Sequence, residues 1–115
     1  MKSLVGRGHL GKTNSGKRGL AIGYEYDHCT MQITPNRTFT RVSFTLYGLN
    51  DTAIVQFYKS NTLLERRPIT ASDSDIDVPV SFQAAGGFSH FTITPGSLSE
   101  DGYDQILVPG IIMFS

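Results

Sequence analysis

The sequence is built from short runs in which apolar and polar residues alternate. In the clearest run, residues 41–47, the apolar Val42, Phe44 and Leu46 alternate with Arg41, Ser43 and Thr45. Further runs cover 20–27, 29–33, 53–59, 63–69, 76–82, 91–93, 106–108 and 111–114. A period of two places successive side chains on opposite faces of a β-strand. Turn residues separate the runs about every 8–12 residues, which is typical of a sandwich or a barrel. We therefore predict a single-domain, all-β antiparallel β-sandwich of jelly-roll type with about eight strands.

Few features of the sequence favour a helix. The charged residues make up 17% of the chain, a low share for a helical protein, whose solvated faces are usually rich in Glu and Lys. Ser97 and Glu100 fit a capping box, but Gly102 limits it to at most one helical turn near 97–101. Pro79 suits an edge strand or a strand end, and Gly86-Gly87 predicts a turn.

The 115 residues fit one domain, within which charge divides the chain in two. Residues 1–20 hold five bases and no acid, and the rest holds five bases and ten acids. Residues 1–19 also contain five glycines and few large apolar side chains. We predict a basic, Gly-rich arm over 1–19, either flexible or an irregular strand that pairs only in context, followed by a β-sandwich domain over 20–115.

The arm contains a match to the phosphate-binding P-loop pattern, from Gly6 to Thr13. That loop requires a buried strand before it and a helix that begins at the lysine, here Lys12. No helical periodicity follows, so we expect no phosphate-binding site. The five bases could attract nucleic acid or an anionic surface. No aromatic residue lies among them, so base stacking has no support and we do not expect nucleic acid as a partner.

Acidic residues gather at two places. Asp73, Asp75 and Asp77 alternate in and beside a polar loop and could offer oxygen ligands to a structural calcium ion. Solvated charges that protect a loop or a strand edge are the alternative explanation. Glu100, Asp101 and Asp104 form a second group beside a predicted turn. The sequence requires no other cofactor.

The sequence gives little support for an enzyme. Cys29 is the single cysteine, so no disulfide can form within the chain. His28 and Cys29 are adjacent, and neighbouring strand residues point to opposite faces, which disfavours a zinc site or a catalytic Cys–His pair. No nucleophile motif occurs, and we predict a non-catalytic protein.

The sequence shows no signal peptide and no apolar run long enough for a membrane helix, so we expect no membrane insertion. The compartment stays open.

Residues 39–114 resemble jelly-roll modules of the galactose-binding or carbohydrate-binding kind, which occur on secreted and surface proteins. The segments that carry the resemblance are Arg41-Val42-Ser43-Phe44, Val55-Gln56-Phe57-Tyr58, Val78-Pro79-Val80-Ser81-Phe82, Gly87-Phe88-Ser89-His90-Phe91 and Tyr103-Asp104-Gln105-Ile106. The chain departs from such modules in having no tryptophan, the residue that often forms their sugar platform.

The resemblance implies a non-catalytic binding module for glycans or a cell surface. Tyrosine rings would stack on sugar faces and carboxylates would accept bonds from hydroxyls. The candidates are Tyr47, Tyr58 and Tyr103, with Asp101 and Asp104 close to the last in sequence. The alternative is a small structural protein of phage or mobile-element type, a homo-oligomer that self-associates through strand edges. A nucleotide-binding enzyme ranks last.

Overall fold

A computed structural model describes residues 2–5, 9–12, 16–21, 30–49, 52–70, 76–95 and 108–115. These residues form strands and connecting turns, and no helix occurs among them. Accordingly, the described part of the chain contains no helix that could span a membrane. The strands are β1 (Lys2–Val5), β2 (His9–Lys12), β3 (Arg18–Ala21), β4 (Thr30–Ile33), β5 (Phe39–Leu49), β6 (Thr52–Lys59), β7 (Thr62–Thr70), β8 (Ile76–Phe88), β9 (His90–Pro95), β10 (Val108–Pro109) and β11 (Met113–Phe114).

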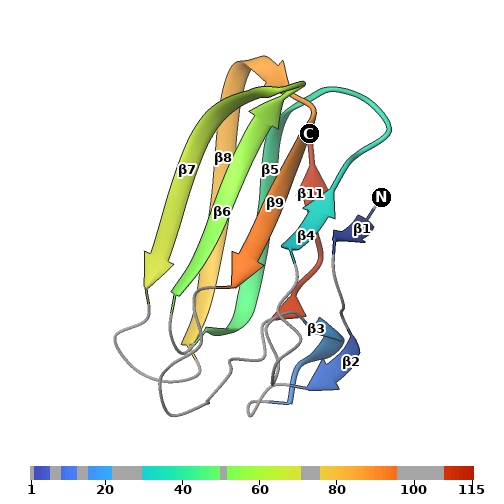
Figure 1. The fold of residues 1–115 in the computed structure, drawn as a ribbon, viewed down its shortest axis with the longest axis vertical. Helices are drawn as coiled ribbons and strands as arrows, with labels where there is room; N and C mark the ends of the chain where they lie inside the picture. The colour runs from blue at the N-terminus through green and yellow to red at the C-terminus, as the bar shows by residue number, and fades with distance from the viewer. Residues whose placement is uncertain are drawn as a thin grey trace.

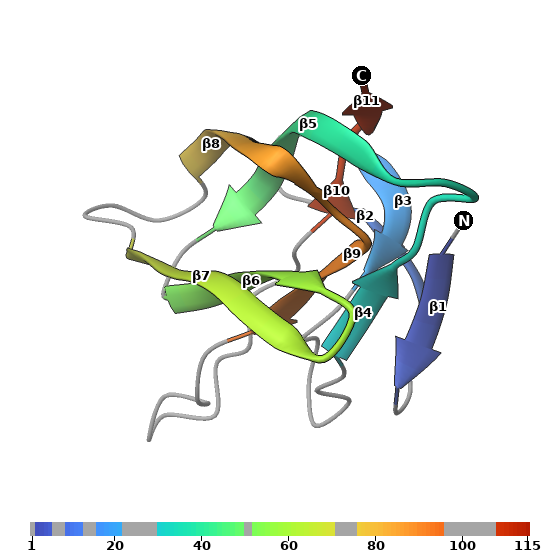
Figure 2. The same ribbon diagram turned by 90° about the horizontal axis from the view of Figure 1, so that it is seen from above.

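Two antiparallel sheets face each other in a sandwich. The five-stranded sheet has the order β1-β4-β9-β6-β7. In the four-stranded sheet, β5 is central, with β8 on one side and both β10 and β11 on the other. Figure 2 shows the two layers from above, with β7 and β8 at the same open side of the sandwich. β2 and β3 form a separate hairpin, which Figure 1 shows below β4 and β1, and β3 lies against β10.

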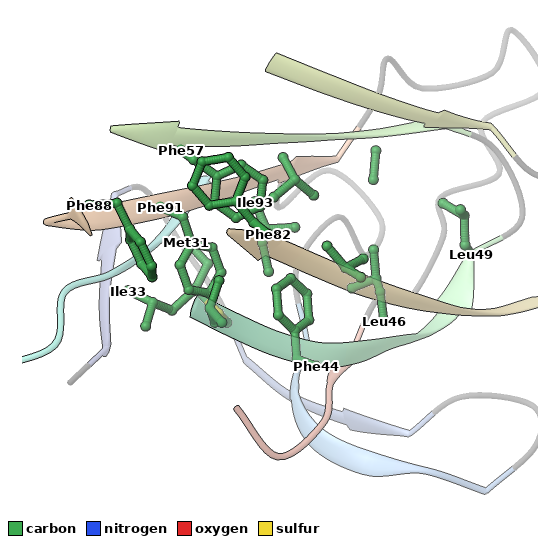
Figure 3. Packing of buried hydrophobic residues seen from close by; sticks show 14 residues of the cluster. Met31, Ile33, Phe44, Leu46, Leu49, Phe57, Phe82, Phe88, Phe91 and Ile93 are labelled. Carbon is green, nitrogen blue, oxygen red and sulfur yellow. The ribbon is translucent and has the colours of Figure 1, made fainter. Parts of the chain in front are cut away.

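The core lies between the sheets and follows from the alternation of the strands. β6 buries Ala53, Val55 and Phe57, and β5 buries Val42, Phe44 and Leu46. The buried set continues with Met31, Ile33, Leu49, Val80, Phe82, Phe88, Phe91 and Ile93 (Figure 3). Because one face of each strand is packed, a slip of one residue would expose its whole apolar set, so the pattern fixes the register.

Stacked phenylalanines join the two layers. The rings of Phe57 on β6 and Phe82 on β8 are stacked, with centroids 4.0 Å apart. Phe44 on β5 stacks on Phe91 on β9 at 5.2 Å. Each pair has one member in each sheet, so these contacts hold the sheets together as well as filling the space between them.

The predicted sandwich fold is confirmed, and most predicted runs coincide with strands. Pro79 lies on an edge strand as predicted, because β8 pairs with β5 alone among the described strands. The turn predicted at Gly86-Gly87 is wrong, since β8 continues to Phe88. The glycines serve a bulge, where the β5–β8 register shifts. Gly87 has a φ of +84°, and a Cβ there would lie 2.5 Å from Thr38, so only glycine fits. The helical turn predicted near 97–101 lies outside the described residues.

Parts of the N-terminal segment are paired in the structure. Of the two states predicted for residues 1–19, Lys2–Val5 adopt the paired one, because β1 forms the edge of the five-stranded sheet beside β4. β3 continues across residue 20, where the pattern of the sequence changes. Gly19 in β3 approaches Val108 in β10 so closely that a Cβ would lie 2.8 Å from its side chain. The change in composition therefore does not coincide with the end of an element.

Candidate functional site

A groove lies on the outer face of the four-stranded sheet. The outward positions of β5 carry Arg41, Ser43, Thr45 and Tyr47, because the alternate positions are buried in the core. Two adjoining hollows of about 620 and 470 Å³ share Ser43, Ser81 and Met113 in their walls. We call the two hollows together the β5–β8 groove. Its other outward-facing residues are Pro79 and Gln83 from β8 and Ile111 and Ser115 from the last segment.

The backbone of β5 fixes both walls of the groove. Thr45 O accepts a hydrogen bond from Gly110 N at 2.8 Å, and Arg41 exchanges two bonds with Ser115. The outward-facing residues of β5 therefore direct their peptide groups to the last segment. In an antiparallel pair, the opposite residues of β8 must then direct theirs away from β5. Ser81, opposite Ser43, thus has its carbonyl at the open edge of the sandwich.

Arg67 closes that open edge. It lies on β7, in the other sheet, and its Nη1 donates to Ser81 O at 2.6 Å. Its Nε donates to Glu65 Oε2 at 2.8 Å, and Nη2 lies 2.5 Å from the same oxygen. The guanidinium also lies over the Phe57 ring, 5.5 Å from its centroid. One side chain therefore covers the core, links the sheets and forms the rim of the larger hollow.

Tyr47, a predicted ligand-binding residue, lies in the groove. The ring is half-buried, and Lys17 Nζ lies over it, 5.1 Å from the centroid. Gly110 packs against the ring edge, where a Cβ would lie 2.7 Å from Cε2. Tyr47 is thus held in place, with a cation from the N-terminal segment on one face.

Tyr58 lies far from Tyr47, on the outer face of the five-stranded sheet. It stacks on His90, with centroids 4.9 Å apart and planes at 6°. His90 Nδ1 is 2.9 Å from Ser89 Oγ, and burial lowers the pKa of the imidazole. Each of the two tyrosine rings therefore has one face covered, that of Tyr58 by His90 and that of Tyr47 by Lys17. The role of Tyr58 stays a prediction.

The remaining predicted site residues divide between described and undescribed parts. Asp77 is exposed on β8. Asp73, Asp75, Asp101, Tyr103 and Asp104 lie outside the described residues. Within the ranges that the structure covers, no group of three His, Cys, Asp or Glu side chains could hold a metal ion. Calcium binding stays a prediction, and a higher melting temperature in millimolar calcium would support it.

The P-loop pattern lies partly in a strand. Lys12, which would begin the helix of such a loop, ends β2 and pairs with Arg18. A strand here aims successive amides to opposite sides and cannot gather them on a phosphate.

The sequence did not single out most groove residues. Arg41, Ser43, Ser81, Gln83 and Met113 are ordinary outward-facing residues in their own strands. The available signal was the alternation itself, which marks these residues as facing away from the core. That β8 and the last segment flank β5 is a tertiary fact.

Comparison with known proteins gives a fold and no family. No protein-family model and no curated protein matches the chain. CsCBM6-3 from Clostridium stercorarium, solved in complex with cellobiose, has a TM-score of 0.51 at 15% identity, over 98% of this chain and 86% of that chain. The chain has a carbohydrate-binding-module type of sandwich. A second structure, carbohydrate-binding module CBM36 in complex with calcium and xylotriose, has a TM-score of 0.46 at 16% identity, over 98% of this chain and 99% of that one.

Proposed function

We propose that this domain is a non-catalytic glycan-binding module and that the β5–β8 groove holds the sugar chain. The observation that carries the proposal is the lining of the groove. Ser43, Thr45 and Ser81 supply hydroxyls along the two strands, and Met113 and Tyr47 supply apolar surface beside them. Sugars present hydroxyls and apolar C–H faces together, so such a mixed surface suits them.

The size of the groove fits an oligosaccharide. Arg41 and Tyr47 are six residues apart on one strand, which spans about 20 Å. The lining side chains stand on paired strands, which hold them more firmly than loops would. Further support comes from the fold, which is shared with a module that was solved with cellobiose.

Binding to a glycan array, followed by calorimetry with the best oligosaccharide, tests the proposal. Ser43 lies where the two hollows meet, so Ser43→Phe should block the groove and abolish binding. Tyr47→Ala should weaken it about 3–10-fold through loss of the ring. Tyr58→Ala is the matched control, because it removes the same side chain from the opposite face, and we expect it to bind normally.

Three results would contradict parts of the proposal. No binding by folded protein across a broad array would overturn glycan binding. Binding that survives Ser43→Phe but is lost in Tyr103→Ala would move the site away from the groove. The alternative, a self-associating structural protein, would gain support if light scattering showed a defined homo-oligomer together with no glycan binding.

A further inference from the structure

Arg41 provides a cation in the larger hollow of the groove, on a backbone that is held by hydrogen bonds. Its backbone N–H donates to Ser115 O at 3.0 Å, and its carbonyl accepts from Ser115 N at 3.1 Å. The exposed side chain lines the hollow beside Ser43 and opposite Gln83 in the β5–β8 register. The lining of this hollow therefore includes a guanidinium group, a side-chain amide and serine hydroxyls.

The described carboxylate in the same hollow is already bound. Glu65 Oε2 accepts from both Nε and Nη2 of Arg67, so these two charges compensate each other. Among the residues that the structure describes, Arg41 has no ion-pair partner. Asp77, the other described acid on this face, lies six residues from Gln83 along β8, which corresponds to about 20 Å. No side-chain carboxylate of the described lining is left to neutralise the Arg41 guanidinium, and Ser115 O, at the end of the given chain, accepts from the backbone N–H groups of Thr40 and Arg41.

Neutral sugars give such a fork no charged partner. An arginine binds a planar carboxylate through two parallel N–H···O bonds, which are stronger than bonds between neutral groups. One face of Tyr47 is covered by Lys17, which leaves more of the recognition to polar contacts. We infer that the groove selects acidic glycans, in which a uronic acid places its carboxylate on Arg41 and its hydroxyls against Ser43, Ser81 and Gln83. This inference rests on the proposed function and adds the class of sugar.

Chemically paired ligands test the inference. Polygalacturonate, alginate and a glucuronic-acid-bearing xylan would each be compared with the same polymer after reduction of its carboxyl groups, using the full-length protein. At least one acidic polymer should bind about tenfold or more tightly than its reduced form. Heparin, a sulfated polymer of high charge density, separates carboxylate recognition from general attraction to polyanions.

Variants assign the effect to Arg41. Arg41→Gln should remove the preference for the acidic polymer, so that the acidic and the reduced polymer bind with equal affinity. Arg41→Lys keeps the charge but loses the fork, and should retain only part of the preference. Arg66→Gln is the control, because Arg66 is an exposed arginine on β7 that faces away from the groove.

The outcomes separate this inference from the proposed function. Equal binding to acidic and reduced polymers would overturn the acidic preference and uphold glycan binding. A preference that follows charge density, with heparin bound most tightly and Arg66→Gln as damaging as Arg41→Gln, would also overturn it. No binding to any polymer would refute the proposed function itself.

Discussion

Replacing Arg67 tests whether one side chain closes the open edge of the sandwich. Arg67→Ala removes the donor to Ser81 O, the partner of Glu65 and the cation over Phe57. The carbonyl at the edge of β8 would be left to water, and the stem of the arginine would no longer cover the core. The free energy of unfolding should therefore fall.

The size of the effect follows from the exposure of the groups. The side chains of Arg67 and Glu65 are 35% and 41% exposed, so their ion pair contributes only about 0.5 kcal/mol. A hydrogen bond from a charged donor is worth up to about 3 kcal/mol when buried, and partial exposure reduces it to about 1 kcal/mol here. The cation–π contact adds about 0.5 kcal/mol. Arg67→Ala should destabilise the domain by about 2 kcal/mol.

Urea denaturation monitored by far-UV circular dichroism measures this loss. Arg66→Ala is the matched control, since the adjacent arginine faces outward, and it should change stability by less than about 0.5 kcal/mol. A double-mutant cycle with Glu65→Ala should give a coupling of about 0.5 kcal/mol. If Arg67→Ala costs no more than Arg66→Ala, the edge does not depend on this contact and the reasoning fails.

Three further changes test other parts of the fold. Burial lowers the pKa of the His90 imidazole. The contribution of neutral His90 to stability is therefore complete above the ordinary histidine pKa of about 6.5, and it is lost as pH falls below that value. His90→Gln should make the free energy of unfolding, measured by chemical denaturation, less dependent on pH between pH 7 and 5. Phe57→Leu removes the stack on Phe82 and should lower the free energy of unfolding by about 1–2 kcal/mol; an unchanged urea midpoint would contradict this. Gly110→Ala places a Cβ 2.7 Å from Tyr47, and should cost about 1–3 kcal/mol and weaken glycan binding as Tyr47→Ala does; calorimetry with normal affinity would show that the ring position is unimportant.

Local sequence patterns were sufficient to predict most strands. Val42, Phe44 and Leu46 alternate with polar residues, so they were expected to face the core together, and the structure buries all three. The proline at residue 79 predicted an edge strand for the same local reason, because it cannot donate to a neighbour. Gly86-Gly87 misled the prediction, since glycine pairs serve bulges as well as turns, and the bulge depends on how β8 pairs with β5.

The candidate site was much harder to predict, because it is made of residues that are unremarkable in sequence. Ser43 and Ser81 are 38 residues apart in the sequence and meet only because β5 pairs with β8. Of the predicted tyrosines, the structure places Tyr47 in the groove and Tyr58 on the opposite face. Such a separation depends on which sheet each strand joins, and no single strand carries that information.

The exposed edge of β8 bears on the alternative function, a protein that self-associates through strand edges. The peptide groups of β8 that face the open side belong to its outward-facing residues, because the alternate ones bond to β5. Among these, Pro79 has no N–H to offer, and the Ser81 carbonyl is already taken by Arg67. A second chain would therefore meet a break in the hydrogen-bonding ladder at two successive outward positions, a usual way of preventing edge pairing. This edge of the sandwich is therefore poorly suited to the self-association through strand edges that the alternative function requires.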